Sequence, residues 1–245
     1  MMDSYTHLDM KVQDPIRDLE SRMDAADVPR AIVVETWGKD NRACLDSLIA
    51  SQSKRFRVAL CFRPDEGKPR PETLRSKVVC ALRVRTSDIQ ALGAYAEALD
   101  IDGKWLLPHS EAGIAALAKE LTQFAQEHPH AKIFVPHLCW PQHDGRDDDD
   151  WYESVSRLSL LPNVVVGISA IAHFSREPFP HKDVESFAAH LRKTFGAEAL
   201  VSGSDYPLFE RDRYADHMRL AEDWIGPQTQ RSHRAESALW GEPSS

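Results

Sequence analysis

Short runs of apolar, mostly β-branched residues alternate with longer stretches of helical spacing along almost the whole chain. This alternation limits the possible folds more than any other feature of the sequence. The apolar runs are nearly continuous, as in Ala31-Ile32-Val33-Val34 and Val164-Val165-Val166. Continuous apolar strands are typical of parallel sheets that are covered on both faces, whereas half-solvated antiparallel strands alternate polar and apolar residues. We therefore expect repeated βα units built around a parallel sheet.

The repeat count favours a closed barrel over an open sheet. Strands are expected at residues 31–35, 57–62, 78–84, 105–108, 133–137, 164–171 and 200–204, with 5–8 as an eighth. Helices are expected at residues 15–26, 41–53, 89–99, 111–126, 151–160, 184–195 and 214–224. Such a chain of 245 residues suits an α/β fold of the distorted (β/α)8 TIM-barrel type, formed as a single domain over residues 1–245. A doubly wound open sheet is the alternative, but no glycine-rich nucleotide motif follows any predicted strand.

The charge balance narrows the choice of partners. The chain has 38 acidic against 30 basic residues, and it has no basic block longer than the pair Lys54-Arg55. These features argue against nucleic acid and against an anionic membrane surface, and leave a small-molecule substrate as the expected partner. Because the sequence has neither a long apolar stretch nor a signal-like start, we expect a cytoplasmic protein.

The four cysteines show no metal-binding or disulfide spacing. Cys44, Cys61, Cys80 and Cys139 are scattered, and no C-x-x-C pair occurs. We interpret them as reduced packing residues. A catalytic role for Cys139, two residues after His137, is the alternative.

Ionisable side chains gather where the predicted strands end. In a parallel barrel these ends meet at one mouth, which carries the chemistry. Three histidines and one aspartate end four of the strands: His7, His109, His137 and Asp205. Such a set suits either the ligation of a divalent metal or acid–base chemistry on a water molecule.

The order of several short motifs resembles the amidohydrolase-related family, in the branch of 2-pyrone-4,6-dicarboxylate lactonase-like hydrolases and decarboxylases related to aminocarboxymuconate semialdehyde decarboxylase. The motifs are Asp3-Ser4-x-Thr6-His7, Leu107-Pro108-His109, Phe134-Val135-Pro136-His137-Leu138, Val164–Ser169, Phe195-Gly196, Gly203-Ser204-Asp205-Tyr206-Pro207 and the final Ala238-Leu239-Trp240-Gly241. The resemblance implies a distorted (β/α)8 barrel, which agrees with the periodicity. It also admits a homo-oligomer, because many members of the family form dimers or larger assemblies.

The resemblance also implies roles for the strand-end residues. Asp205 matches the aspartate that contacts the metal and takes a proton from water, and His109 matches a ligand histidine. His137 matches the histidine that polarises or protonates the substrate, and His7 matches the second histidine of an H-x-H pair. Tyr5 stands where that pair has its first histidine, and a phenol with a pKa of about 10 is a poor ligand at neutral pH. Two alternatives therefore remain for this site. Either zinc is bound by His7, His109 and Asp205, or the site works without a metal.

Metal-free hydrolysis can be written with the same residues. Asp205 would accept a proton from a water that attacks a lactone or ester carbonyl, while His137, His109, Tyr5 and Arg83 offer donors to the developing oxyanion. The candidate substrate-binding residues are Tyr5, Arg83, Arg85, Trp37 and Ser169.

Two further expectations concern specificity. Arg83 and Arg85 lie two positions apart on one strand, and we expect one to point into the barrel as a clamp for a substrate carboxylate and the other to point outward. Gly167 stands where lactonase-like relatives usually have lysine, which predicts a different substrate.

The remaining histidines carry no distinguishing pattern. We expect surface positions for those on helices or helix ends, which are His128, His130, His190, His217 and His233. The spacing of the loop histidines does not set them apart from solvent-exposed ones: His143, His173 and His181.

Three functions follow. The first is a hydrolase that acts on a small lactone or ester through Asp205. The second is a metal-dependent decarboxylase of the same family. The third is a repurposed barrel that binds or cyclises a small molecule without hydrolysis.

Overall fold

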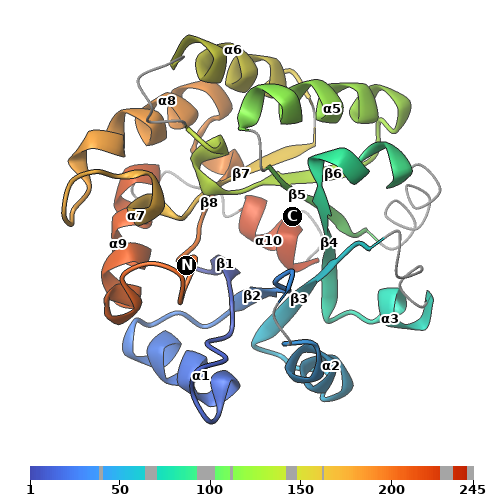
Figure 1. The fold of residues 1–245 in the computed structure, drawn as a ribbon, viewed down its shortest axis with the longest axis vertical. Helices are drawn as coiled ribbons and strands as arrows, with labels where there is room; N and C mark the ends of the chain where they lie inside the picture. The colour runs from blue at the N-terminus through green and yellow to red at the C-terminus, as the bar shows by residue number, and fades with distance from the viewer. Residues whose placement is uncertain are drawn as a thin grey trace.

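Eight parallel strands, hydrogen-bonded to their neighbours in chain order, form one sheet that curves into a barrel (Figure 1). The computed structural model describes residues 1–38, 41–63, 71–92, 103–110, 113–141, 148–161, 163–226 and 234–241. The strands are β1 (Asp3–Thr6), β2 (Ala31–Val34), β3 (Phe56–Cys61), β4 (Val79–Arg85), β5 (Trp105–His109), β6 (Lys132–Val135), β7 (Val164–Ile168) and β8 (Leu200–Ser202). The predicted α/β barrel is confirmed.

Hydrogen bonds between the first and last strands bring the barrel close to closure. The hydroxyl of Ser202 in β8 donates to the carbonyl of Met2 at 3.2 Å. Beyond β8, the amide of Asp205 donates to the carbonyl of Tyr5 at 2.9 Å, and the amide of His7 donates to the carbonyl of Tyr206 at 2.7 Å. Asp205, the predicted base, is thus hydrogen-bonded to β1.

Helices surround the sheet. They are α1 (Pro15–Ala25), α2 (Arg42–Ala50), α3 (Pro71–Arg75), α5 (Ile114–Glu127), α6 (Asp148–Leu158), α7 (Ile171–Phe174), α8 (Glu185–Phe195), α9 (Tyr214–Ile225) and α10 (Arg234–Trp240). The helix expected at 89–99 is described only over its first four residues, where a 3-10 turn spans Gln90–Leu92. None of the helices in the described ranges is long and apolar enough to cross a membrane.

The alternation of side chains along each strand divides the core in two. In β2, Ala31 and Val33 pack in the layer between sheet and helices, whereas Ile32 and Val34 pack inside the barrel. Because both faces of the strand are buried, its sequence is apolar throughout, as the continuous runs predicted.

The helix α10 closes the end of the barrel where the strands begin, and it lies at the centre of the ring of strands in Figure 1. Its Leu239 and Trp240 pack with the residues inside the barrel. The indole nitrogen of Trp105 donates to the carbonyl of Ala238 at 3.3 Å. A cavity of about 770 Å³ lies at this end, lined among others by Trp105, Lys132 and Ala238. In parallel barrels the active site lies at the end where the strands finish, so chemistry is expected at the end opposite to α10.

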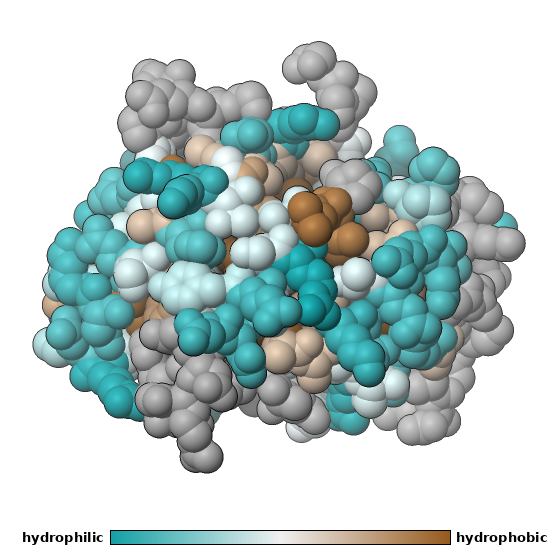
Figure 2. Space-filling model, turned by 90° about the horizontal axis from the view of Figure 1, so that it is seen from above, coloured by the Kyte–Doolittle hydropathy of each residue, from teal (hydrophilic) through white to brown (hydrophobic). Residues whose placement is uncertain are grey.

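The outer surface is mainly polar on the side seen in Figure 2, where apolar residues occupy only small areas. Large apolar side chains that are exposed in the described part of the chain are scattered: Met10, Leu160 and Leu208. Isolated apolar residues of this kind are normal on a protein surface and do not mark a binding face.

Candidate active site

The predicted catalytic side chains meet at the mouth of the barrel. The ring of Tyr5 lies 5.3 Å from that of His7 and 4.3 Å from that of His137. The Nε2 atom of His7 is 3.6 Å from Oδ1 of Asp205. The guanidinium of Arg83 contacts Nδ1 of His109 at 3.3 Å and faces the Tyr5 ring at 5.9 Å. Residues that end β1, β4, β5, β6 and β8 thus form one continuous set of contacts.

Asp205 is held in place by a buried network around Asp3. Asp205 has a positive φ of 56°, which for a residue other than glycine requires support from its surroundings. The carboxylate of Asp3 accepts the amide of Ser204 at 2.9 Å and its hydroxyl at 2.7 Å. Asp3 therefore braces the turn that carries Asp205. Asp3 belongs to the first of the family-like motifs, but it stands at the start of β1, so its place in the sequence does not indicate this role.

The carboxyl group of Asp205 is buried without a hydrogen bond to one of its oxygens. The residue is 4% exposed, and Oδ1 has no hydrogen-bond partner. Burial raises the pKa of Asp205 to about 8, with Arg83 opposing this change and Asp3 adding to it. A carboxyl group tuned to this range can exchange a proton with substrate or water near neutral pH.

The tautomer of His7 follows from its neighbours. Its Nδ1 lies 2.7 Å from the carbonyl oxygen of Val34, which can only accept a hydrogen bond. Nδ1 therefore carries the proton, and in the neutral ring Nε2 presents a lone pair toward Asp205. Two acceptor atoms face each other across this gap when the carboxylate is ionised.

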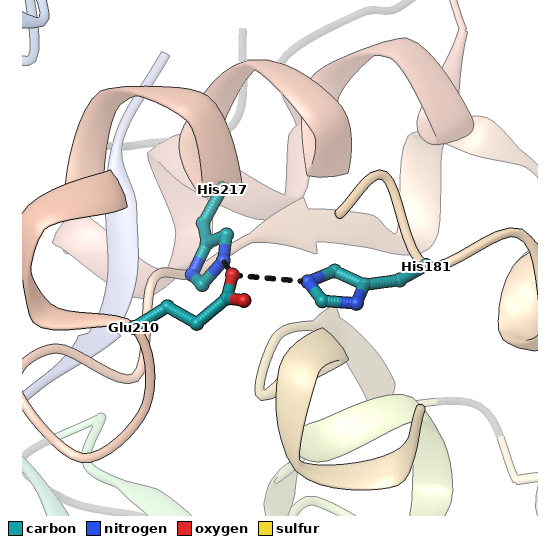
Figure 3. A group of neighbouring side chains, drawn as sticks. All are labelled: His181, Glu210 and His217. Carbon is teal, nitrogen blue, oxygen red and sulfur yellow. Dashed lines mark hydrogen bonds and ion pairs between the residues drawn. The ribbon is translucent and has the colours of Figure 1, made fainter. Parts of the chain in front are cut away.

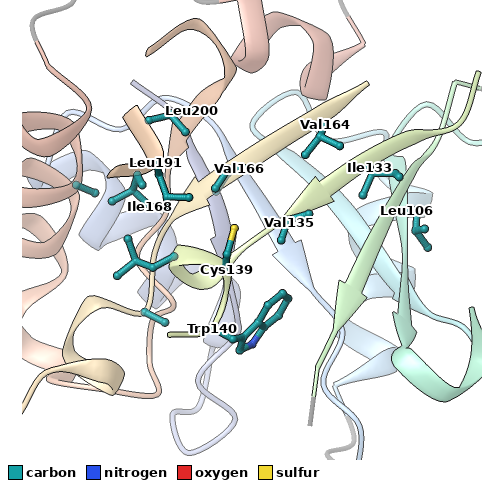
Figure 4. Packing of buried hydrophobic residues seen from close by; sticks show 14 of the residues in the cluster. Leu106, Ile133, Val135, Cys139, Trp140, Val164, Val166, Ile168, Leu191 and Leu200 are labelled. Atoms are coloured by element: carbon teal, nitrogen blue, oxygen red, sulfur yellow. The ribbon is translucent and has the colours of Figure 1, made fainter. Parts of the chain in front are cut away.

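His137 lies on a left-handed turn. The four residues from His137 to Trp140 all have positive φ values, between 51° and 59°, a conformation that costs about 1–2 kcal/mol per residue. Leu138 and Cys139 are fully buried, and the indole of Trp151 donates to the carbonyl of Leu138 at 3.1 Å. In Figure 4 the thiol of Cys139 points into the apolar layer beside β7. The buried anchor stabilises the strained backbone that aims His137 into the mouth.

This burial also decides between the two interpretations of Cys139. Burial raises the pKa of its thiol, which keeps it protonated and poorly nucleophilic. The packing role is therefore the one that the environment supports. The four cysteines are all free.

Ser169 orients the ring of His137. The amide of His137 donates to the Ser169 hydroxyl oxygen at 3.0 Å, and the same hydroxyl lies 3.1 Å from Nδ1. Burial lowers the pKa of His137 well below its usual range, with Arg83 and neighbouring imidazoles adding to the effect. The ring is therefore neutral, and the Ser169 hydroxyl can donate to Nδ1, which places the ring proton on Nε2. Ser169, expected to contact substrate, is fully buried behind His137 and acts through it.

Arg83 is a buried cation at the centre of the mouth. It donates to the carbonyl of Glu35 at 2.8 Å, and its guanidinium lies 4.5 Å from the centre of the Trp37 ring. Its Nε has no hydrogen-bond partner. Within the described residues it contacts no carboxylate, since the side chain of Glu35 is bound by Arg63 and by the amide of Cys61.

The expected opposite orientations of Arg83 and Arg85 are wrong. Both guanidinium groups lie on the Trp37 ring, that of Arg85 at 5.2 Å. Residues two apart on a strand point to the same side, so both arginines face the mouth. They differ in depth, because Arg83 is buried and Arg85 is exposed.

His109 is a neutral neighbour of this cation. Its ring lies 5.1 Å from that of Trp37. Burial, together with Arg83 and Arg85, lowers the pKa of His109 to about 4. Because Arg83 can only donate, Nδ1 of His109 accepts, and Nε2–H is free to contact a ligand.

The donor set does not fit a three-ligand metal centre. Within the described residues, the one group of three metal-ligating side chains with all ligand atoms within 4.8 Å is His181, Glu210 and His217, which excludes the expected set of His7, His109 and Asp205. The Nδ1 lone pair of His109 is occupied by Arg83. Burial also raises the pKa of Tyr5, although Arg83 opposes it, so the phenol stays protonated. A fixed guanidinium stands among the residues that would have to hold a dication.

Two histidines differ from the sequence interpretation. His217, expected at the surface, is 5% exposed, and His181, whose spacing suggested nothing, is 2% exposed. His173 is exposed, with its ring 4.7 Å from that of Phe209. The expectations for His143 and His233 lie outside the described residues. His181 and His217 differ from the other histidines because both lie against Glu210, a proximity in space that the sequence does not show.

The packing around position 167 explains why a glycine stands there. A Cβ atom added there would lie 3.0 Å from the Phe134 ring and 3.1 Å from the backbone of Pro136. Phe134 therefore fills the space that a larger residue at position 167 would need, and a lysine would require this wall of the barrel to rearrange.

Comparison with known proteins places the chain in a family. The sequence pattern of the amidohydrolase family matches residues 3–232, and the chain belongs to this family. L-fucono-1,5-lactonase from Burkholderia ambifaria is 30% identical over 108 residues, which cover 43% of this chain but only 35% of that enzyme.

Three solved structures share the fold. A putative 2-pyrone-4,6-dicarboxylic acid hydrolase from Pseudomonas putida has a TM-score of 0.77 at 18% identity, with coverage of 100% of this chain and 98% of the other. An amidohydrolase from Burkholderia multivorans with bound zinc has a TM-score of 0.70 at 19% identity and coverage of 98% and 95%. A 5-carboxyvanillate decarboxylase from Sphingomonas paucimobilis has a TM-score of 0.60 at 13% identity and coverage of 94% and 84%.

Proposed function

We propose that this protein hydrolyses a small lactone that carries a carboxylate, with Asp205 as the base and Arg83 as the clamp for the carboxylate. The buried Arg83 guanidinium is the observation that carries the proposal. A buried cation is costly when no anion pairs with it, as is the case for Arg83 among the described residues, and here it lies at the mouth that holds the acid–base groups. The lactonase among the relatives supports the same reaction class.

Substrate binding follows from the geometry around Arg83. A carboxylate placed against the guanidinium would accept from its N–H groups and pair with the buried charge. Trp37 packs against one face of the guanidinium and provides an apolar wall for the lactone ring. Bound in this way, the lactone shares the mouth with Asp205, the proposed base.

Water activation uses Asp205 and His7. The ionised carboxylate accepts a proton from water, and the lone pair of His7 Nε2 accepts the second water hydrogen and so orients the nucleophile. The water oxygen bonds to the lactone carbonyl carbon, and the carbonyl oxygen becomes an oxyanion. His137 Nε2–H donates to this oxyanion. When the ring C–O bond breaks, Asp205 returns its proton to the leaving oxygen, so the product is a hydroxy acid.

The decarboxylase alternative rests on a metal that orients the substrate. The donor atoms at the mouth supply two neighbouring positions, His7 Nε2 and Asp205 Oδ1, and His109 does not complete them. The geometry therefore favours hydrolysis over decarboxylation as the function of this mouth.

The test compares carboxylated lactones with their carboxamides, which keep the size and lose the charge. We expect turnover of a carboxylated lactone, and a KM at least about tenfold higher in Arg83→Met, with a much smaller change for the carboxamide. Arg157→Met is the control, because it removes an exposed arginine of α6 that pairs with the exposed Glu153.

Two outcomes would contradict the proposal. Equal losses on both substrates in Arg83→Met would show that the guanidinium does not recognise the carboxylate. No turnover of any lactone by the unaltered protein would favour a barrel that binds or cyclises a small molecule without hydrolysis.

A further inference from the structure

We propose that His181, Glu210 and His217 form a zinc site at the rim of the barrel, separate from the candidate active site (Figure 3). His181 precedes α8 in the segment that follows β7, Glu210 follows β8, and His217 belongs to α9. The three residues come from two consecutive loops of the catalytic end and from the helix after them. A bound ion would tie these segments together.

The ligand atoms converge on a single point. Oε2 of Glu210 lies 3.2 Å from Nε2 of His181 and 2.9 Å from Nε2 of His217, and all three atoms lie within 4.8 Å of one another. Ligands at about 2.0–2.1 Å from a tetrahedral zinc ion are separated by roughly 3.3 Å. Small side-chain shifts would therefore admit an ion between them.

The tautomer of His181 points to a cation. Its Nδ1 lies 3.0 Å from the carbonyl oxygen of Glu177, which can only accept a hydrogen bond, so Nδ1 carries a proton. In the neutral ring the lone pair of Nε2 then faces the carboxylate oxygen of Glu210. Two acceptors at this distance repel unless a second proton or a metal ion lies between them. A backbone carbonyl that fixes the ring in this way is also the usual support of a ligating histidine.

The surroundings suit a partly enclosed site with one open side. His181 and His217 are almost completely buried, and the ring of Phe179 lies 5.8 Å from the first and 6.4 Å from the second. The Glu210 side chain is 35% exposed, which leaves a path for an ion and room for water as a fourth ligand.

One cation competes for this carboxylate. Nε of Arg213 lies 3.9 Å from Oε2 of Glu210, but Arg213 also donates to Asp216 at 3.2 Å and is about half exposed. An exposed side chain of this kind can move away at little cost when an ion enters.

The ligand chemistry selects zinc. Two imidazoles and one carboxylate form a nitrogen-rich set for a transition metal, whereas calcium and magnesium require mostly oxygen ligands. Calcium should therefore not bind at this site and serves as the negative control.

The experiment measures zinc binding by the chelator-treated full chain in competition with a chromophoric chelator. We expect one zinc per chain and no competition from calcium. Glu210→Gln keeps the shape and loses the charge, and should weaken zinc binding at least about tenfold. Glu185→Gln is the matched control, since Glu185 is a nearby acid paired with exposed Lys182, and should bind within about twofold of the unaltered protein. Asp205→Asn should keep full uptake, which locates the ion away from the mouth.

A second measurement needs no substitution. Nitrogen NMR of the histidine rings in the unaltered protein should show Nε2 of two histidines shifting on zinc addition. If neither ring responds, or if Glu210→Gln binds as tightly as the unaltered protein, the cluster is a protonated His181 paired with Glu210 and the proposal is wrong. Loss of uptake in Asp205→Asn would also overturn it, because the ion would then lie at the mouth.

Discussion

Two clusters at the same end of this barrel each combine imidazoles with a carboxyl group, but their environments differ. At the centre, Asp205 has an unpartnered oxygen beside His7, and burial raises its pKa to about 8. At the rim, burial alone would raise the pKa of Glu210, but the hydrogen bond from His217 outweighs burial, with His181 adding to the effect, and the pKa is lowered. The comparison teaches that the neighbours of a carboxyl group, and not its residue type, decide whether its pKa lies above or below the usual range.

The substitution with the largest expected effect separates the two clusters. Asp205→Asn should reduce kcat for lactone hydrolysis by about 10² or more, because an amide cannot accept a proton from water. Steady-state kinetics with a carboxylated lactone checks this, with circular dichroism as a control for folding. If the kcat of the variant stays within tenfold of that of the unaltered protein, a residue other than Asp205 is the base.

Zinc should stabilise the protein through the rim cluster alone. At a free zinc concentration 100 times Kd, the free energy of unfolding should rise by about 2.7 kcal/mol. Urea denaturation in buffered zinc measures this rise, which we expect in the unaltered protein and in Asp205→Asn but not in Glu210→Gln. Equal stabilisation of all three would show that the two clusters do not differ in metal binding.

The central cluster should control the pH dependence of activity. The raised pKa of Asp205 means that the carboxyl group is protonated, and inactive as a base, below about pH 8. The value of kcat/KM should therefore rise about tenfold per pH unit up to this point and then level off. A rate profile between pH 5 and pH 9 tests the prediction, and a plateau that begins near pH 5 would contradict the environment described for Asp205.

The smallest expected effect concerns the support of His137. Ser169→Ala removes the hydrogen bond that keeps Nδ1 unprotonated, and should lower kcat by about fivefold, the value of one hydrogen bond near 1 kcal/mol. Nitrogen NMR should show His137 mainly as the Nε2–H tautomer in the unaltered protein and as a mixture in the variant. Lower activity with an unchanged tautomer would assign Ser169 a purely structural role.

The repeat pattern of the sequence predicts the barrel because strands buried on both faces must be continuously apolar. The first strand does not follow this pattern, because β1 spans Asp3–Thr6, whereas the apolar residues predicted a strand at 5–8. Asp3 and Ser4 are polar and look like loop residues, but they are fully buried against the turn after β8. Ser204, which donates to Asp3, is about 200 residues away in the chain, so no local pattern reveals this contact.

The candidate site was predictable where strand ends alone decide position. His7, His109, His137 and Asp205 all lie at the expected mouth, because parallel strands finish at one end of a barrel. The left-handed turn at His137 could not be predicted, since none of its four residues is glycine and only the buried anchor makes it stable.

By itself, the sequence determined the βα repeat, the end of the barrel where chemistry gathers, and the side chains available there. Only the tertiary structure decided that Arg83 and Arg85 share one side, that His109 pairs with a cation, and that His181 and His217 meet at Glu210. The physical reason is that periodicity records burial along the chain, whereas proton affinity and ligand geometry depend on distances and burial between residues far apart in the sequence.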